Sequence, residues 1–326
     1  MDKKSILFVT EKWCDLNPEL GLTNSYHNTF QTFEHFNNGE YTYDIIHLDE
    51  CKLRYNADIN QILIDYCSKH KVDIIIFTLL NAEGVNPSTD TYIKLRSMGC
   101  YLCVIWPDTG PSWGMQTIQE LSSYIDLHIS WDNPKTAGVG GFHQLYTSPR
   151  SYNHISLWTP EDPALYYYEE NKDIDVSFMG SVEKYRDREE FVRLAKNYDI
   201  NIHIGGGQRK EKLSPSQYAS IIRRSKIGIN FSLSQTGVFH QAKGKMFEYT
   251  ASGGLLLEFD NPSIKDFFEA NIDYVPFTNW DELFTKIKYY LENENERKVI
   301  AENGHKTFND KWNSNIYWKT LLGKIL

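Results

Sequence analysis

The sequence predicts an α/β protein made of two doubly wound parallel-sheet domains. Short apolar runs bounded by turn residues, which are typical of buried strands, alternate along the chain with segments of helical periodicity. This alternation continues at the spacing that is typical of doubly wound sheets. A chain of 326 residues is also long enough for two such domains.

The composition fits a globular protein and disfavours one class of partner. Apolar residues make up 41% of the chain and aromatic residues 14%, which is ample for a core. The 34 Lys and Arg residues are outnumbered by 43 Asp and Glu residues, for a net charge of −9. An acidic balance argues against a general binder of nucleic-acid backbones, but it leaves room for a local basic patch.

The five cysteines are scattered, and only Cys100 and Cys103 form a C-x-x-C pair. No second pair and no suitably spaced histidine completes a zinc site, so we expect buried, reduced thiols. No stretch reaches the ~20 apolar residues of a membrane-spanning helix. The first four residues lead directly into a strand and do not form a signal peptide, which predicts a cytoplasmic location.

The first half contains a regular series of strands and helices. Strands are expected at residues 5–10, 43–48, 72–78, 101–106 and 125–130, and helices at 26–36, 60–70 and 92–98. The run at 72–78 is apolar throughout, which predicts a central strand. Glycines and prolines then gather in residues 135–160, before an acidic, tyrosine-rich stretch. This change of composition predicts a domain boundary, with a first domain at residues 1–155 and a second that begins at residue 156.

The second half repeats the pattern. Strands are expected at residues 175–179, 200–204, 227–231, 255–257 and 274–277, and helices at 187–197, 214–224, 241–250 and 264–269, with further helices from residue 279 onward. The tail from Trp312 to Leu326 carries an aromatic and apolar stripe, whose default role is packing.

The stretch from Gly237 to Phe259 is the strongest candidate for a ligand site. It places two lysines, Lys243 and Lys245, near the start of a predicted helix. Unpaired N–H groups at a helix N-terminus favour phosphate oxygens, and lysine adds a point charge. Glu248 follows on the same helix; its carboxylate would repel phosphate and is better suited to accept hydrogen bonds from sugar hydroxyls.

This stretch also carries a family resemblance. Its pattern K-G-K-x-F-E-x-x-x-x-G-G resembles the signature of CgeB-like (spore-maturation-type) glycosyltransferases, which are related to the group 1 nucleotide-sugar transferases of GT-B fold. In the wider group, an E-x7-E motif carries two glutamates. Glu248 matches the second, and Gly253 lies in the small-residue turn that follows it. The first glutamate falls on His240, which is a departure from the pattern.

The resemblance extends from Asp175 to about Phe308 and implies a fold. It implies two Rossmann-like domains that face a cleft, with the nucleotide-sugar domain at residues 156–308. A C-terminal helix at 309–326 would then cross back to the first domain. Over the first half, the chain matches only in architecture.

The resemblance also implies residues that contact the donor. A strand D-V-S-F-M followed by Gly180 and Ser181, with Arg186 and Arg188 close behind, resembles the segment that touches the donor diphosphate. The two arginines could instead be solvated helix residues that pair with Glu189 and Glu190. Two further donor-side candidates follow strands: Gly205, in a glycine run that suits either close backbone approach or an ordinary loop, and Ser232.

On the acceptor side, the resemblance implies contacts from the loop after the first strand, at Thr23, Asn24 and His27. The alternative is a helix N-cap followed by an exposed histidine. Asp108 directly follows a predicted strand, where ligands of such sheets bind, and Trp113 lies nearby to stack on a sugar. Asp108 could instead simply begin a turn with Pro107.

The resulting hypothesis is a glycosyltransferase that moves a sugar from a nucleoside-diphosphate sugar, such as a UDP-sugar, to a hydroxyl acceptor. Lysine and arginine side chains would stabilise the leaving diphosphate, so no metal and no cofactor is expected. Asp108 and His240 are the candidate catalytic residues. The resemblance implies retention of anomeric configuration, for which same-face attack needs no protein base.

Two alternatives remain at this point. The first is a non-catalytic protein of the same fold that binds nucleotide sugars or glycans, which His240 in place of a glutamate keeps open. The second is a DNA-modifying glycosyltransferase of the kind some viruses carry, which the acidic net charge disfavours.

Overall fold

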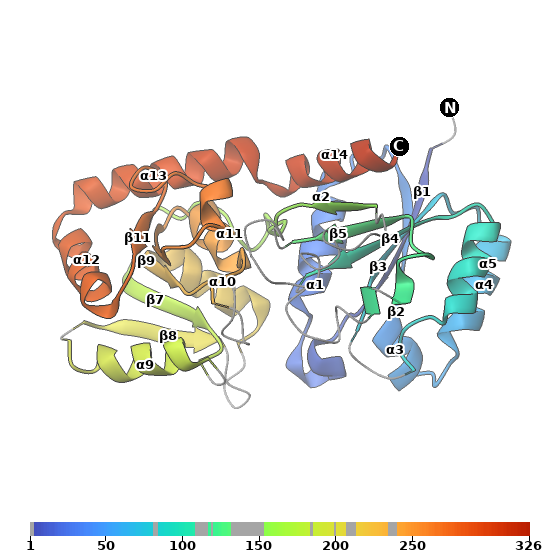
Figure 1. Cartoon of the computed structure of the whole chain (residues 1–326), viewed down its shortest axis with the longest axis horizontal. Coiled ribbons are helices and arrows are strands. Elements are labelled where there is room, and N and C mark those ends of the chain that lie inside the picture. Colours follow the sequence, from blue (N-terminus) through green and yellow to red (C-terminus); the bar gives the residue numbers. More distant parts are fainter. Residues whose placement is uncertain are drawn as a thin grey trace. The chain divides into compact units, whose positions relative to one another are not determined.

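The structure is a computed structural model of the chain (Figure 1). It describes residues 3–80, 84–107, 117–118, 120–131, 153–182, 185–198, 200–206, 213–233 and 240–326, with only the backbone of Asp15, Leu53 and Arg186. The described residues form two compact units, one up to Leu157 and the other from Trp158 onward. Each unit is an α/β sheet with helices, as the sequence predicts.

The first unit is built on a six-stranded parallel sheet in the order β2-β1-β3-β4-β5-β6. The strands are β1 (Ser5–Thr10), β2 (Thr42–His47), β3 (Ile74–Thr78), β4 (Tyr101–Trp106), β5 (Leu127–Ser130) and β6 (His154–Ser156). All five residues of β3 are buried, which confirms the central strand predicted from its continuous apolar run. Strand β6 was not predicted, because it is short and lies in the glycine- and proline-rich stretch.

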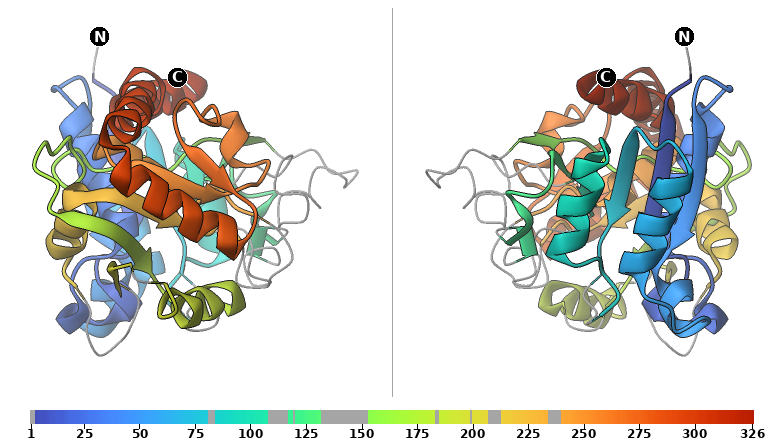
Figure 2. Two further views of the ribbon diagram at one scale, coloured as in Figure 1. Left: turned by 90° about the vertical axis from the view of Figure 1, so that its left-hand side faces the viewer. Right: turned by 90° about the vertical axis from the view of Figure 1, so that its right-hand side faces the viewer.

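The helical segments of the first unit include the three predicted ones with shifted ends, at residues 24–36, 59–69 and 89–97, and others that were not predicted. They are the 3-10 turns η1 (Cys14–Leu16) and η2 (Pro18–Leu20), then α1 (Asn24–Tyr26), the π-helical η3 (His27–Gln31), α2 (Thr32–Phe36), α3 (Leu48–Leu53), α4 (Ile59–Lys69) and α5 (Thr89–Ser97). Helices α4 and α5 lie side by side (Figure 2). Their buried residues Leu63, Tyr92 and Leu95 join the core made by the strands.

The second unit has a five-stranded parallel sheet in the order β11-β10-β9-β7-β8. Its strands are β7 (Ile174–Gly180), β8 (Ile202–Gly206), β9 (Ser225–Asn230), β10 (Leu255–Phe259) and β11 (Val275–Phe277). Its helices are α9 (Arg186–Ala195), α10 (Pro215–Arg224), α11 (Gly244–Ala251), the 3-10 turn η4 (Ile264–Asp266), α12 (Trp280–Glu292), α13 (Glu294–Lys311) and α14 (Ser314–Ile325). Apolar side chains of β7, β9 and β10 and of helices α9, α12 and α13 form its core.

Helix α11 begins three residues later than predicted, at Gly244. The residues before it are held in a different pattern: Leu233 and His240 form an antiparallel bridge, and the Gln241 N–H donates to the Ser232 carbonyl at 2.9 Å. Lys243 therefore occupies the N-cap position of α11. This shift places both lysines at the very start of the helix.

Helix α14 confirms the predicted helical tail, with Tyr317, Trp318 and Leu321 fully buried. The crossing of this helix to the first unit stays a prediction. None of the described helices is both long and apolar enough to cross a membrane.

Candidate functional site in the second unit

Charged and glycine residues gather where β7, β9 and β10 end and α11 begins. Strand β7 lies between β8 and β9 in the sheet. The chain passes from β7 to its neighbour β8 on one side and then crosses back to β9 on the other side, so the direction of strand addition reverses at β7. Ligands of such sheets bind beyond the carboxyl ends of the strands at this reversal point. Here Gly180 ends β7 and Asn230 ends β9, while Glu258 lies next to Asn230 on β10.

Helix α11 is open to solvent only at its N-terminus. Residues 246–251 are all buried, whereas Lys243, Gly244 and Lys245 are partly exposed. No side chain caps the helix. The backbone N–H groups and positive dipole end of α11 are therefore available to an anion.

Lys245 lies directly against the end of β7. A side chain on Gly180 would begin 2.7 Å from Lys245 Cε and 2.9 Å from Nζ, and Gly180 has a φ of +152°. The φ value favours glycine at this position, and any side chain there would push the end of the Lys245 side chain away. Burial lowers the pKa of Lys245 to about 8, helped by the nearby positive charges of Arg188 and Lys243 and opposed by Glu248 and Glu258.

Arg188, on α9, supplies a second cation at the same place. The residue is 3% exposed, and its guanidinium donates to the carbonyls of Ser181 at 2.7 Å and Phe231 at 3.4 Å. It also lies over the Tyr185 ring at 3.6 Å, and its Nε–H has no hydrogen-bond partner. Burial lowers the pKa of this group too. Among the described residues, neither Lys245 nor Arg188 forms a close ion pair, although the carboxyl groups of Glu248 and Glu258 lie near enough to act on the charge of Lys245.

Glu248 is the hydrogen-bonding carboxylate of the site. It is buried, and its Oε2 accepts a hydrogen bond from the Tyr218 hydroxyl at 3.1 Å. Burial raises its pKa, while the Lys245 charge and the hydroxyls of Tyr218 and Tyr166 act in the opposite direction. Glu258 is also buried and accepts from Asn230 Nδ2 at 2.7 Å, and burial raises its pKa to about 8.

The predicted glycine run has a specific packing role. A side chain on Gly206 would begin 2.7 Å from the Tyr218 ring, and the φ of Gly206 is +87°. The glycine therefore makes room for the tyrosine that holds Glu248. Gly205 precedes it in β8, opposite Met179 of β7, and so lies at the same edge of the sheet.

His240 and Ser232 form a hydrogen-bonded pair beside these groups. The Ser232 hydroxyl contacts His240 Nδ1 at 2.8 Å, and the imidazole stacks on Phe259 with ring centres 5.5 Å apart. Burial lowers the pKa of His240, which the Asp187 carboxylate partly offsets. Ser232 thus positions the histidine, whose Nε2 has no hydrogen-bond partner among the described residues.

The remaining residues predicted to contact the donor lie at different distances from the start of α11. Ser181 is exposed next to Gly180, and the Lys243 ammonium donates to the Gln241 side chain. Gly253 lies past the far end of α11, where a side chain would meet the Tyr168 ring at 2.5 Å, so the structure does not bring it to Lys245. Arg186 is the first residue of α9 and is described by its backbone alone.

Among the residues predicted for the acceptor side, Thr23 is the N-cap of α1, which was the alternative to an acceptor contact. It is buried, and its Oγ1 accepts from the Tyr26 N–H at 3.0 Å. Asn24 is exposed at the start of α1, and His27 begins the π-helical turn. Asp108 and Trp113 lie outside the described residues.

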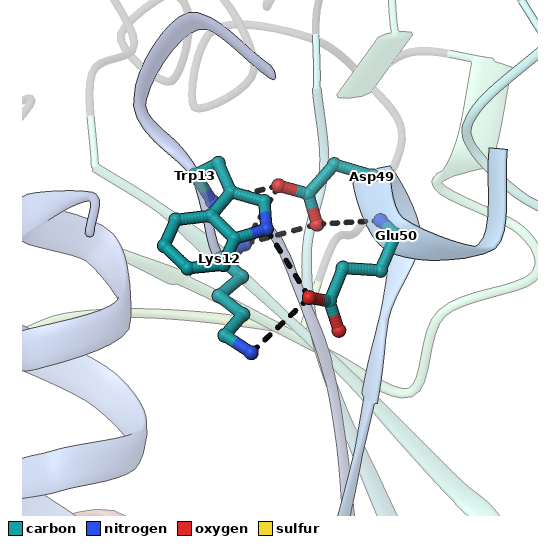
Figure 3. Close-up of polar contacts among 4 residues, drawn as sticks. All are labelled: Lys12, Trp13, Asp49 and Glu50. Carbon is teal, nitrogen blue, oxygen red and sulfur yellow. Dashed lines mark hydrogen bonds and ion pairs between the residues drawn. The ribbon is translucent and has the colours of Figure 1, made fainter. Parts of the chain in front are cut away.

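The loop that leads from β1 to Thr23 is held by Asp49 (Figure 3). The fully buried Asp49 carboxylate accepts from the N–H groups of Lys12 at 3.1 Å and Trp13 at 2.7 Å. The Lys12 ammonium and the Trp13 indole N–H reach Glu50 at 3.1 and 3.2 Å. Burial alone would raise the pKa of Glu50, but Lys12, His47 and Trp13 together hold it below its usual range.

Three residues next to Glu248 were not predicted from the sequence. Tyr218 lies on α10, while Tyr166 and Glu161 come from the acidic, tyrosine-rich stretch that was interpreted as a passage between domains. Glu161 is 2% exposed, and neither carboxyl oxygen has a hydrogen-bond partner. An acidic stretch is usually solvated, so composition alone gives no reason to bury it.

A family model covers the part of the chain that contains this candidate site. Residues 186–323, which include Arg188, Lys245 and Glu248, match the family model described as "Glycosyl transferase-like". No curated protein sequence matches the chain.

Solved structures with the same fold are similar over almost the whole chain. They include HepE (Alr3699) of Anabaena in complex with UDP and glucose, at 10% identity and a TM-score of 0.66, covering 98% of this chain and 100% of that one. An α-glucosyltransferase in complex with UDP and a DNA 13-mer that contains a HMU base has 10% identity and a TM-score of 0.66, with 100% of both chains covered. Sucrose-phosphate synthase of Thermosynechococcus elongatus has 8% identity and a TM-score of 0.66, with 99% of both chains covered.

Two parallel Rossmann-like sheets and a glycosyltransferase domain define the class of this protein. It is a glycosyltransferase of GT-B fold. This confirms the predicted fold and enzyme class over the non-catalytic alternative.

Proposed function

We propose that this glycosyltransferase uses a nucleoside-diphosphate sugar, with uridine as the nucleoside, and transfers the sugar to a hydroxyl acceptor. The observation that carries the proposal is the pair of cations at the end of β7. Neither Lys245 nor Arg188 forms a close ion pair with a described residue, and both lie beside the uncapped start of α11. A diphosphate offers two negative charges that can pair with these two cations.

Glu248 extends this site toward hydroxyl groups. Its carboxylate is held by Tyr218 on a helix whose start faces the anion site. A carboxylate accepts hydrogen bonds from sugar hydroxyls with good geometry. The choice of uridine is supported by the similar structures of HepE and of an α-glucosyltransferase, both in complex with UDP.

In the proposed reaction, the bond between the sugar C1 and the diphosphate oxygen breaks, and a bond from C1 to the acceptor oxygen forms. Negative charge grows on the leaving diphosphate, where Lys245, Arg188 and the N–H groups of α11 stabilise it. In a retaining, same-face reaction the acceptor proton passes to that diphosphate. The reaction then needs neither a protein base nor a metal ion.

Three further assignments belong to this proposal. His240, fixed by Ser232, would contact the donor sugar through Nε2. Thr23, Asn24, His27, Asp108 and Trp113 would line the acceptor side. The K-G-K-x-F-E pattern supports the CgeB-like subtype.

The direct test is a transfer and hydrolysis assay of the purified protein with UDP-, GDP- and ADP-linked hexoses. We expect release of UDP from a UDP-sugar, undiminished by EDTA. Because a ligand that binds only the folded state raises the melting temperature, the same nucleotides are screened by thermal shift. Absence of both binding and turnover with all three nucleotide classes would refute the proposal.

A hydroxyl on DNA is the second acceptor to test, because one similar structure holds DNA together with UDP. The net charge of −9 makes glycans the first choice. Incubation with UDP-glucose and DNA that carries hydroxymethylated bases, followed by mass measurement of the DNA, decides between the two. A salt-dependent gel shift of the same DNA reports binding independently of transfer.

A further inference from the structure

The C-x-x-C pair of the sequence is divided between the two faces of strand β4. Cys100 directly precedes the strand, and Cys103 lies within it. Side chains three positions apart point to opposite faces of a strand, because successive side chains alternate. Cys100 accordingly belongs to the core cluster that α4 and α5 join, together with Leu102 and Val104, whereas Cys103 does not. The two cysteines of the motif are therefore not placed to bond to each other.

The structure instead brings Cys100 next to Cys67 of helix α4. Cys67 packs against the same core cluster from the helix, and a hydrogen bond joins the two thiols. Cys100 is 6% exposed, whereas Cys67 is more open to solvent and only half-buried. Both cysteines are reduced. Two thiols from separate elements are thus in contact, and one of them can be reached from solvent.

The hydrogen bond makes the two sulfurs chemically unequal. Cys67 donates its S–H hydrogen to Cys100, which lowers the pKa of Cys100, while burial and the Asp73 carboxylate act in the opposite direction. The same hydrogen bond, together with burial, raises the pKa of Cys67. Cys100 therefore carries the negative charge when the pair loses a proton, and a thiolate is the form of cysteine that reacts with oxidants. Cys67 remains beside it as a second thiol that can attack an oxidised Cys100.

We propose that Cys67 and Cys100 form a dithiol that hydrogen peroxide oxidises to a disulfide between α4 and the start of β4. The Cys100 thiolate first attacks one peroxide oxygen and becomes a sulfenic acid, and the other oxygen leaves as hydroxide, which takes up the proton lost by Cys100 to give water. The Cys67 sulfur then attacks the Cys100 sulfur. The S–S bond forms, and the sulfenic hydroxyl leaves with the Cys67 proton as a second water. Two thiols thus pass two electrons to one peroxide molecule.

This disulfide closes a loop of the first unit that contains β3 and α5. A cross-link stabilises a fold mainly by restricting the unfolded chain, and a longer loop gains more. The expected consequence is a rise in melting temperature of about 5–10 °C on oxidation. The inference does not depend on the donor or the acceptor of the transferase reaction.

The test treats the folded protein with hydrogen peroxide and then alkylates the remaining thiols in denaturant. Peptide mass spectrometry identifies each cysteine as alkylated, cross-linked or oxidised to a sulfinic acid, and thermal unfolding is measured before and after treatment. The variants are Cys67→Ser and Cys100→Ser. Cys14→Ser removes another partly buried cysteine of the same unit and is the matched control.

Wild type and Cys14→Ser are expected to form a cross-link between Cys67 and Cys100 that dithiothreitol reverses, with the rise in melting temperature. Cys67→Ser lacks the second thiol, so Cys100 should proceed to the sulfinic acid without that rise. Recovery of both Cys67 and Cys100 as alkylated thiols, after a treatment that oxidises Cys14, would overturn the proposal. A cross-link from Cys100 to any other cysteine, or sulfinic acid at Cys100 in wild type, would overturn it as well.

Discussion

The two units share one strand order but carry different residues at the point where the order reverses. In the first unit β1 and β3 end in Thr10 and Thr78, whose buried hydroxyls bond to each other. In the second unit the matching strands β7 and β9 end in Gly180 and Asn230, beside Lys245 and Arg188, which form no close ion pair with a described residue. In the first unit the two strand ends are joined by a hydrogen bond between neutral hydroxyls. In the second unit the cationic side chains of Lys245 and Arg188 lie at the corresponding strand ends.

The difference teaches that strand order alone does not make a diphosphate site. Both sheets run in the order 2-1-3 around the reversal, so both offer the same edge. Only the second unit adds a glycine at the strand end, which lets Lys245 lie against the backbone. In the first unit, the loop after β1 is instead fixed through Asp49. The next predictions follow from this contrast.

The largest effect is expected from Lys245→Met, which removes the cation against Gly180 and keeps most of the apolar stem. Affinity for UDP should fall about 100-fold, in line with the loss of a buried, charge-assisted contact of about 3 kcal/mol. Titration calorimetry measures the loss. Lys226→Met is the control, because that lysine forms a surface ion pair with Asp175. Lys243→Ala should cost less, since its ammonium already bonds Gln241. Equal UDP affinities in wild type and Lys245→Met would contradict the site.

The second prediction concerns pH. Burial lowers the pKa of Lys245 to about 8, so its charge is lost as pH rises through that value, while Glu258, with a pKa raised to about 8, becomes negative. Both changes weaken diphosphate binding, so UDP affinity should fall by up to about tenfold per pH unit above pH 8. Calorimetry at pH 7 to 10 measures the slope.

The free protein provides the control for this profile. Between the lowered pKa of Lys245 and its ordinary value of 10.5, the unfolded chain binds more protons than the folded one. This lysine by itself therefore makes the folded state more stable as pH rises from 8 to 10.5. Thermal unfolding of the free protein at each pH separates weaker binding from loss of the folded state. A pH slope that persists unchanged in Lys245→Met would show that another group controls binding.

The smallest effect on the affinity for UDP is expected from Asp49→Asn in the first unit. The amide replaces one acceptor oxygen by a donor, so some backbone N–H groups of Lys12, Trp13 and Glu50 lose their partner. Stability should fall by about 1–3 kcal/mol, measured by denaturant unfolding. UDP affinity should not change, whereas transfer to acceptor should slow. Asp65→Asn, on the exposed side of α4, is the control. Reduced UDP affinity in Asp49→Asn would break the proposed division between the units.

The sequence by itself determined most of the strands and pointed to the segment that we propose as an anion site. Continuous apolar runs such as Ile74–Phe77 and Leu255–Leu257 lie in predicted strands, where both faces of the sheet are buried. The lysines and Glu248 were found because their chemistry and spacing are local to one helix. A donor contact from Gly253 stays a prediction: this glycine follows the C-terminal end of α11, whereas Lys245 lies at the start of that helix.

Only the tertiary structure decided which distant groups complete the site. Arg188 from α9, Tyr218 from α10 and Glu161 from an acidic stretch reach the start of α11 because the parallel sheet brings the carboxyl ends of its strands to one edge. No local pattern predicts the burial of an acidic side chain without partners, because burial depends on what the rest of the chain packs around it.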